Sequence, residues 1–99
     1  MFHLFKEQKL KTNKMNMTNH FRERLNERTG YNVETFLYDL NNRRNEIIKM
    51  DKYSEELDWY PYLKDSYKSY PNSILFLIES LKVCLVSDGR NLITLYNIG

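Results

Sequence analysis

The sequence predicts an α+β fold in which two N-terminal helices precede an antiparallel β-sheet meander. Two patterns carry this prediction: an amphipathic stripe within residues 32–42, and three apolar, β-branched segments after residue 73. The helical pattern comes first and the strand pattern follows without alternation, which is typical of the α+β class. The 99 residues are enough for one core. We expect a flexible basic extension at residues 1–16 and a single domain at 17–99.

The first predicted helix covers residues 19–28. Thr18 or Asn19 is expected to cap its N-terminus, because a short polar side chain there accepts a hydrogen bond from the first free backbone amides. Gly30 is expected to end the helix, since glycine readily adopts the left-handed conformation that closes a helix.

The second predicted helix begins after Asn32 as its cap and stops at residues 41–42. Its apolar residues follow the i, i+3, i+4, i+7 spacing of one buried helix face. They are Val33, Phe36, Leu37 and Leu40.

The β half is expected to start with a short strand within residues 46–50. Three further strands are predicted at 74–79, 82–87 and 91–97, where Ile, Leu, Val, Phe and Tyr are dense. Asp88-Gly89 predicts a hairpin turn between the last two.

Residues 51–71 lie between the two strand regions and are crowded with Tyr and acidic residues. Ser54 can cap a turn of helix, but Pro61 argues against one uninterrupted helix. We expect one helical turn followed by irregular structure.

The net charge of +2 does not by itself identify a nucleic-acid-binding protein, but its distribution is uneven. Residues 1–30 carry seven Lys/Arg against three Asp/Glu, whereas residues 31–60 carry four against seven. Such an asymmetry would orient an anionic partner, although an uneven solvated surface explains it equally well.

Cys84 is the only cysteine, so no internal disulfide can form, and no Cys/His cluster has the spacing of metal ligands. We therefore expect no metal and no cofactor. A buried, reduced thiol suits a cytoplasmic protein. Residues 1–10 lack the apolar stretch of a signal peptide, and the longest apolar run, 74–78, is too short to span a membrane.

The main functional clue is the spacing of His20, Arg24 and Arg28 along the first predicted helix. Residues four apart stack on one helix face, so an imidazole would lie one turn from two guanidiniums. Such a set can grip a phosphate and transfer a proton, as metal-free RNA cleavage requires. His20 is the candidate proton carrier and Arg24 the candidate catalytic cation; Arg28 and Arg22 are candidates for binding substrate.

Thr94 and Tyr96 complete the candidate catalytic set from the last predicted strand. Alternating strand residues point to one face, so this strand would present a hydroxyl and a phenol together, for positioning the phosphate or stacking on a base. Simpler explanations exist for both groups. Glu23 and Glu27 interleave with the arginines and would form a salt-bridged exposed face, and Thr94 and Tyr96 would equally suit a core.

The order of these features resembles small RelE-like domains of the barnase–EndoU–colicin–RelE type. The resemblance rests on His20-x-x-x-Arg24-x-x-x-Arg28-x-Gly30 followed by a second amphipathic helix, and on the closing Ile93-Thr94-Leu-Tyr96. It implies a two-helix, antiparallel-sheet fold and metal-independent RNA cleavage, often by toxins. It points to His20, Arg24, Thr94 and Tyr96 as site residues. Residues 51–71 are long for a compact member and would cover or reshape the site.

Three functions follow as expectations. The first is a small metal-independent ribonuclease or ribonuclease-like toxin acting on RNA, with an antitoxin as a protein partner. The second is a non-enzymatic phage or mobile-element protein that inhibits a host factor, with Trp59, Tyr60 and Tyr62 as anchors for that protein. The third is RNA binding through the same basic face without cleavage.

Overall fold

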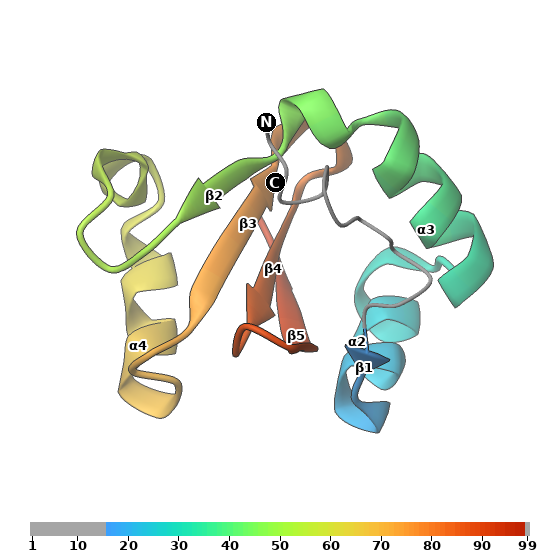
Figure 1. Cartoon of the computed structure of the whole chain (residues 1–99), viewed down its shortest axis with the longest axis horizontal. Coiled ribbons are helices and arrows are strands. Elements are labelled where there is room, and N and C mark those ends of the chain that lie inside the picture. The colour runs from blue at the N-terminus through green and yellow to red at the C-terminus, as the bar shows by residue number, and fades with distance from the viewer. Residues whose placement is uncertain (1–15, 99) are drawn as a thin grey trace.

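A five-stranded sheet with the strand order β1-β5-β4-β3-β2 forms the centre of the fold. The computed structural model describes residues 16–98. Helices α2 and α3 lie on one side of the sheet, and the short helices of residues 51–71, called here the middle segment, lie on the other (Figure 1). Two helices precede four of the five strands, so the predicted α+β class is confirmed.

The two predicted helices are present with the predicted caps. Helix α2 spans Asn19–Thr29, and the Thr18 hydroxyl accepts a hydrogen bond from the backbone amide of the third residue after it at 3.0 Å. Gly30 ends α2 in the left-handed conformation, with φ 78°. Helix α3 spans Val33–Asn42 and is capped by the side chain of Asn32.

Four strands form the antiparallel part of the sheet. Asp88 and Gly89 make the predicted turn between the last two: Gly89 has φ 100°, and the Asp88 carboxylate accepts hydrogen bonds from the next two backbone amides after Gly89. The strands are β2 (Ile48–Met50), β3 (Ile74–Ile78), β4 (Val83–Ser87) and β5 (Asn91–Asn97).

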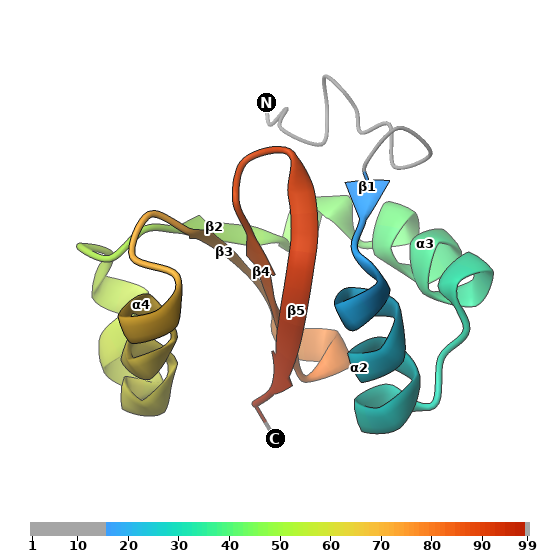
Figure 2. The same cartoon turned by 90° about the horizontal axis from the view of Figure 1, so that it is seen from below.

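The sheet is mixed, which corrects the prediction of a purely antiparallel meander. Strand β1 (Asn16–Met17) runs parallel to β5 at the edge of the sheet (Figure 2). The backbone amide of Thr18 donates to the carbonyl oxygen of Leu92 at 3.1 Å, so the chain is held along β5 immediately before α2 begins. Asn16, predicted to belong to the extension, is thus paired with β5; residues 1–15 lie outside the described residues.

One face of the sheet, called here the first face, packs against α2 and α3. Phe21 and Leu25 of α2 and Phe36 and Leu40 of α3 are all buried there. Of the four residues whose spacing predicted the second helix, Phe36 and Leu40 are buried, and Val33 and Leu37 are half-buried. Helix α2 packs mainly along β5, which places its basic residues beside that strand.

The opposite face, called here the second face, is covered by the middle segment. Leu57 and Leu63 insert from two turns of 3-10 helix into a cluster with the sheet residues. In place of the predicted helical turn and irregular stretch, the segment forms three short helices in succession. They are η3 (Glu55–Trp59), η4 (Pro61–Asp65) and α4 (Ser66–Ser69).

Candidate nucleic-acid interface

Helix α2 carries the predicted basic residues along one flank. His20, Arg24 and Arg28 are spaced by one turn each, beside the buried stripe of Phe21 and Leu25 that fixes the helix on the sheet. This flank, called here the basic flank, is His20, Arg24 and Arg28.

The side chains of the basic flank differ in their surroundings. The exposed side chain of His20 makes no hydrogen bond or ion pair with another described residue, and the same holds for the exposed side chain of Arg22. Arg24 forms an ion pair with Glu27 at 2.8 Å, as the simpler explanation expects. Among residues 16–98, the His20 and Arg22 side chains are thus unpaired, whereas Arg24 is paired with a carboxylate.

Thr94 and Tyr96 point to one face of β5, as their alternation predicts, but it is the second face. Thr94 pairs with Val86 and Tyr96 with Cys84, and both partners belong to the cluster under the middle segment. Thr94 is only 3% exposed. The structure therefore does not bring the Thr94 hydroxyl beside the basic flank.

The reason is the packing register of β5. Leu92 and Leu95 both face α2, although they are three residues apart, because the pairing with β4 shifts register between Val86 and Ser87. That arrangement commits Thr94 to the opposite side of the sheet. His20 and Thr94 consequently lie on opposite sides of β5, and the four candidate catalytic residues are not brought together.

Arg28 nevertheless joins the two predicted segments. Its guanidinium donates a hydrogen bond to the carbonyl oxygen of Leu95 and lies 5.6 Å from the centre of the Tyr96 ring. The Arg28 side chain can pass around the edge of β5 because β1 pairs only with Asn91 and Leu92, the first two residues of that strand. A cation over an aromatic face, on a strand edge that pairs with no further strand within residues 16–98, is a suitable contact for a phosphate and a base.

The environment of Tyr96 keeps its phenol protonated. Burial raises the pKa of Tyr96, and nearby Tyr70 adds to the rise, while the Arg28 cation opposes it. A neutral phenol donates a hydrogen bond rather than accepting a proton. Tyr67 and Tyr70 of the middle segment pack against the same cluster as Tyr96. The middle segment therefore covers this side of the candidate site.

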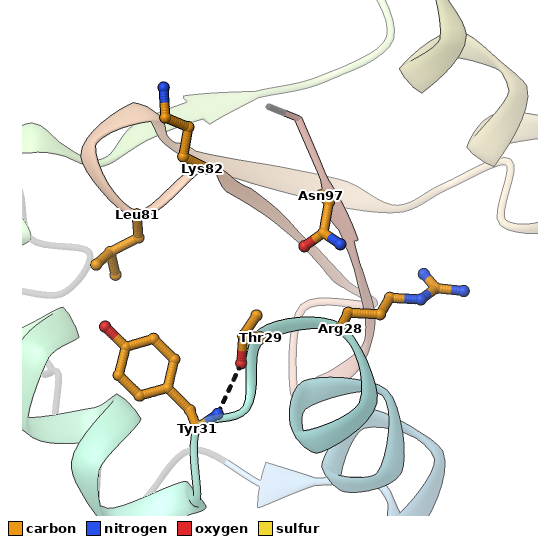
Figure 3. Close-up of a pocket in the computed structure, with 6 residues that line it drawn as sticks. All are labelled: Arg28, Thr29, Tyr31, Leu81, Lys82 and Asn97. Carbon is orange, nitrogen blue, oxygen red and sulfur yellow. Dashed lines mark hydrogen bonds between the residues drawn. The ribbon is translucent and has the colours of Figure 1, made fainter.

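A cavity of about 400 Å³ lies at the C-terminal end of α2, next to the Arg28–Tyr96 contact. The Tyr31 ring and Leu81 flank one side of it and the Asn97 amide another, while the charged ends of Arg28 and Lys82 point outward at its rim (Figure 3). Its lining residues are Arg28, Thr29, Tyr31, Leu81, Lys82 and Asn97.

Sequence reasoning identified only Arg28 among these lining residues. Tyr31 follows the helix-ending Gly30, Leu81 lies between two predicted strands, and Lys82 was predicted to begin the strand at 82–87, whereas β4 begins at Val83. The backbone of Lys82 has φ 60° and ψ 38°, a conformation uncommon for residues other than glycine. This conformation marks the turn in the structure, but the sequence does not indicate it.

Comparison with known protein families, with curated proteins and with solved structures finds no significant match to this chain. Within residues 16–98, no helix is long and apolar enough to cross a membrane. In the same part of the chain, no three His, Cys, Asp or Glu side chains are grouped to hold a metal ion.

Proposed function

We propose that the protein acts on RNA, which it binds along the basic flank of α2 and the adjoining edge of β5. The observation that supports this most directly is Arg28, whose guanidinium lies over Tyr96 and hydrogen-bonds the strand edge. Exposed His20 continues the basic flank toward the start of α2. Single-stranded RNA suits such a surface, because its phosphates need cations and its bases can stack on an aromatic ring.

Metal-independent cleavage, as by a ribonuclease or ribonuclease-like toxin, is the stronger form of this proposal. It assigns the proton transfer to His20, which is exposed, and the stabilisation of phosphate charge to Arg24 and Arg28. Thr94 is buried on the second face and takes no direct part, and Tyr96 acts through its contact with Arg28. The active set is thus smaller than the four residues named from the sequence.

The first test measures binding of a fluorescently labelled, mixed-sequence single-stranded RNA by anisotropy over a series of salt concentrations. Arg28→Ala should weaken binding about tenfold, because a charged hydrogen-bonded contact is lost. It should also reduce the salt slope by about 0.7, the contribution of one phosphate contact. Arg44→Ala, which removes an exposed arginine of the short helix η2 (Arg44–Glu46), is the matched control. Equal binding by both variants would contradict the assignment of Arg28.

Cleavage is tested on the same RNA in EDTA, with the wild type, His20→Ala and Arg44→Ala. Products from the wild type and Arg44→Ala, but not from His20→Ala, would support the enzymatic form. Binding without products from any of them would leave an RNA-binding protein and reject cleavage of this substrate.

A second candidate function, non-enzymatic binding of a host protein, is favoured by a separate observation. Trp59 is 60% exposed and Tyr62 50% exposed on the middle segment, beside the acidic residues of η3. Tyr60 between them is held by its hydrogen bond to Glu79 at 2.8 Å. A protein retained by the wild type and by Tyr53→Ala but lost with Trp59→Ala would support this function, because Tyr53 is exposed outside the 3-10 turns.

A further inference from the structure

The cavity at the end of α2 combines an aromatic ring, an apolar side chain and an amide. Tyr31 and Leu81 supply the first two and Asn97 the third (Figure 3). None of its six lining residues is acidic. A volume of about 400 Å³ is in the range of small-ligand sites and exceeds what a single planar ring system needs.

The Tyr31 ring is held in place before any ligand arrives. Its hydroxyl donates to the Asp39 carboxylate at 2.7 Å, and its ring meets Phe36 edge-on with 5.6 Å between ring centres. The hydrogen bond to Asp39 is the main cause of the raised pKa of Tyr31, so the phenol stays neutral. A fixed ring at the side of a cavity suits stacking against a flat ligand.

The Asn97 amide has no hydrogen-bond partner among residues 16–98, so its donor and acceptor groups are both available. Its position is nevertheless fixed, because the next residue, Ile98, donates its backbone amide to the carbonyl oxygen of Lys82 at 3.0 Å. That bond ties the turn after η5 (Glu79–Leu81) to the end of β5. The edge of a nucleobase presents both donors and acceptors, which one amide can match.

Two cations stand at the rim rather than inside the cavity. Arg28 and Lys82 contribute their aliphatic stems to the lining, and their charged ends point outward in Figure 3. The left-handed backbone of Lys82 is secured on both sides, since its amide donates to Glu79 and its carbonyl accepts from Ile98. A cavity with an aromatic ring and an amide inside and cations at its rim fits a neutral flat group joined to anionic ones.

We propose that this cavity takes one unstacked base of single-stranded RNA, stacked on Tyr31 and hydrogen-bonded by Asn97, with the neighbouring phosphates on Arg28 and Lys82. This inference rests on the proposed binding of RNA and names the part of the substrate that the pocket recognises. Arg28 would then serve both the strand edge and the pocket, linking successive nucleotides.

The test uses ¹⁵N-labelled full-length protein and the four ribonucleoside 5′-monophosphates as probes, with ribose 5-phosphate as the matched ligand without a base. We expect the nucleotides to shift the amide signals of Leu81, Lys82 and Asn97, and ribose 5-phosphate to shift them at least fivefold less. Equal shifts from the sugar phosphate, or nucleotide shifts only at other positions, would overturn the base pocket.

Variants separate base recognition from overall RNA binding. Asn97→Ala should bring the affinities for the four homopolymeric RNAs to within about twofold of one another, with the salt slope unchanged, because it removes base contacts and no charge. Asn45→Ala, at an exposed asparagine in η2, is the control and should keep the wild-type ranking. An unchanged ranking in Asn97→Ala overturns the pocket while leaving RNA binding intact. Failure of the wild type to bind any RNA instead rejects the proposed function itself.

Discussion

The two faces of the sheet are covered in different ways, and this difference explains where buried polar side chains have hydrogen-bond partners and where they do not. On the first face, α2 and α3 have side-chain caps and regular buried stripes. On the second face, the cover is a series of short turns anchored by Leu57 and Leu63. Among the described residues, all the buried side-chain oxygens without a partner lie within residues 66–73. They belong to Ser66, Tyr67 and Ser73.

Regular helices satisfy their own backbone groups and leave one apolar stripe to bury, whereas short turns bring polar side chains down with the apolar ones. The second cover should therefore be the more adaptable of the two. It is also the cover that closes over Thr94 and Tyr96, so its stability decides how much of that side of the sheet is accessible.

The largest expected difference comes from a matched pair of leucine truncations. Leu40 on α3 and Leu57 on η3 are both completely or almost completely buried. Leu40→Ala should reduce the free energy of unfolding by about 3–4 kcal/mol, because α3 cannot collapse into the cavity. Leu57→Ala should cost about 2 kcal/mol, since the surrounding 3-10 turns can shift to fill the space. Urea unfolding curves of the two variants give both values.

If Leu57→Ala lowers the free energy of unfolding as much as Leu40→Ala does, the expected difference between the two faces is wrong. Such a result would mean that the middle segment is packed as rigidly as the helical layer. Ile47→Val, a small truncation within the first-face cluster, should lower the free energy of unfolding by about 1 kcal/mol and calibrates the scale.

The same contrast decides what the sequence could predict. Caps at Thr18 and Asn32 and the spacing of the apolar residues identified the helices of the first face, because these signals are local. Strand β1 has only two residues and therefore no period to detect. Leu57 and Leu63 are six residues apart, a separation that does not place two residues on one face of an α-helix, and none of the residues between them is buried, so no repeat indicated the succession of turns.

For the candidate site, likewise, the local helix spacing was predictable and the tertiary contacts were not. Spacing placed His20, Arg24 and Arg28 on one flank of a helix, which the structure retains. The side of the sheet that Thr94 and Tyr96 occupy depends on a register shift between β4 and β5, a tertiary feature without a local signal. The contact of Arg28 with Tyr96 joins residues 68 positions apart around a strand edge, and no pattern in the sequence announces it.

The dependence of the free energy of unfolding on pH tests how well the second face excludes water from Cys84. Burial raises the pKa of the Cys84 thiol from its ordinary 9.0 to about 12 in the folded protein. Because the folded pKa is the higher one, the contribution is fully present below pH 9 and is lost as pH rises from 9 toward 12. Between pH 8 and pH 10 the thiol should therefore lower the free energy of unfolding by about 1 kcal/mol.

Cys84→Val keeps an apolar side chain of similar size and removes this titration. Urea unfolding at pH 8 and pH 10 should show a smaller loss in the variant than in the wild type, by about 1 kcal/mol. The tyrosines titrate in both proteins and cancel in the difference. An equal loss in the two proteins would show that the thiol is reached by water, and that the second face opens more readily than its burial indicates.

The smallest expected effect comes from removing one tyrosine hydroxyl on each face of the sheet. The Tyr31 hydroxyl donates to Asp39 at 2.7 Å on the side of α3, whereas the Tyr67 hydroxyl, in the middle segment, is buried without a partner among the described residues. Tyr31→Phe should lower the free energy of unfolding by about 1 kcal/mol, the net value of a hydrogen bond. Tyr67→Phe should raise it by about 1 kcal/mol, because an unsatisfied polar group leaves the interior.

The two variants make the same chemical change, so opposite signs in urea unfolding would arise from surroundings alone. A destabilising Tyr67→Phe would show that this hydroxyl has a bonding partner in solution, and the second face would then be as well satisfied as the first. A stabilising result would have a functional consequence. The middle segment would be retaining a polar group at a cost to stability beside Tyr96, on the side of β5 that Arg28 reaches around to meet.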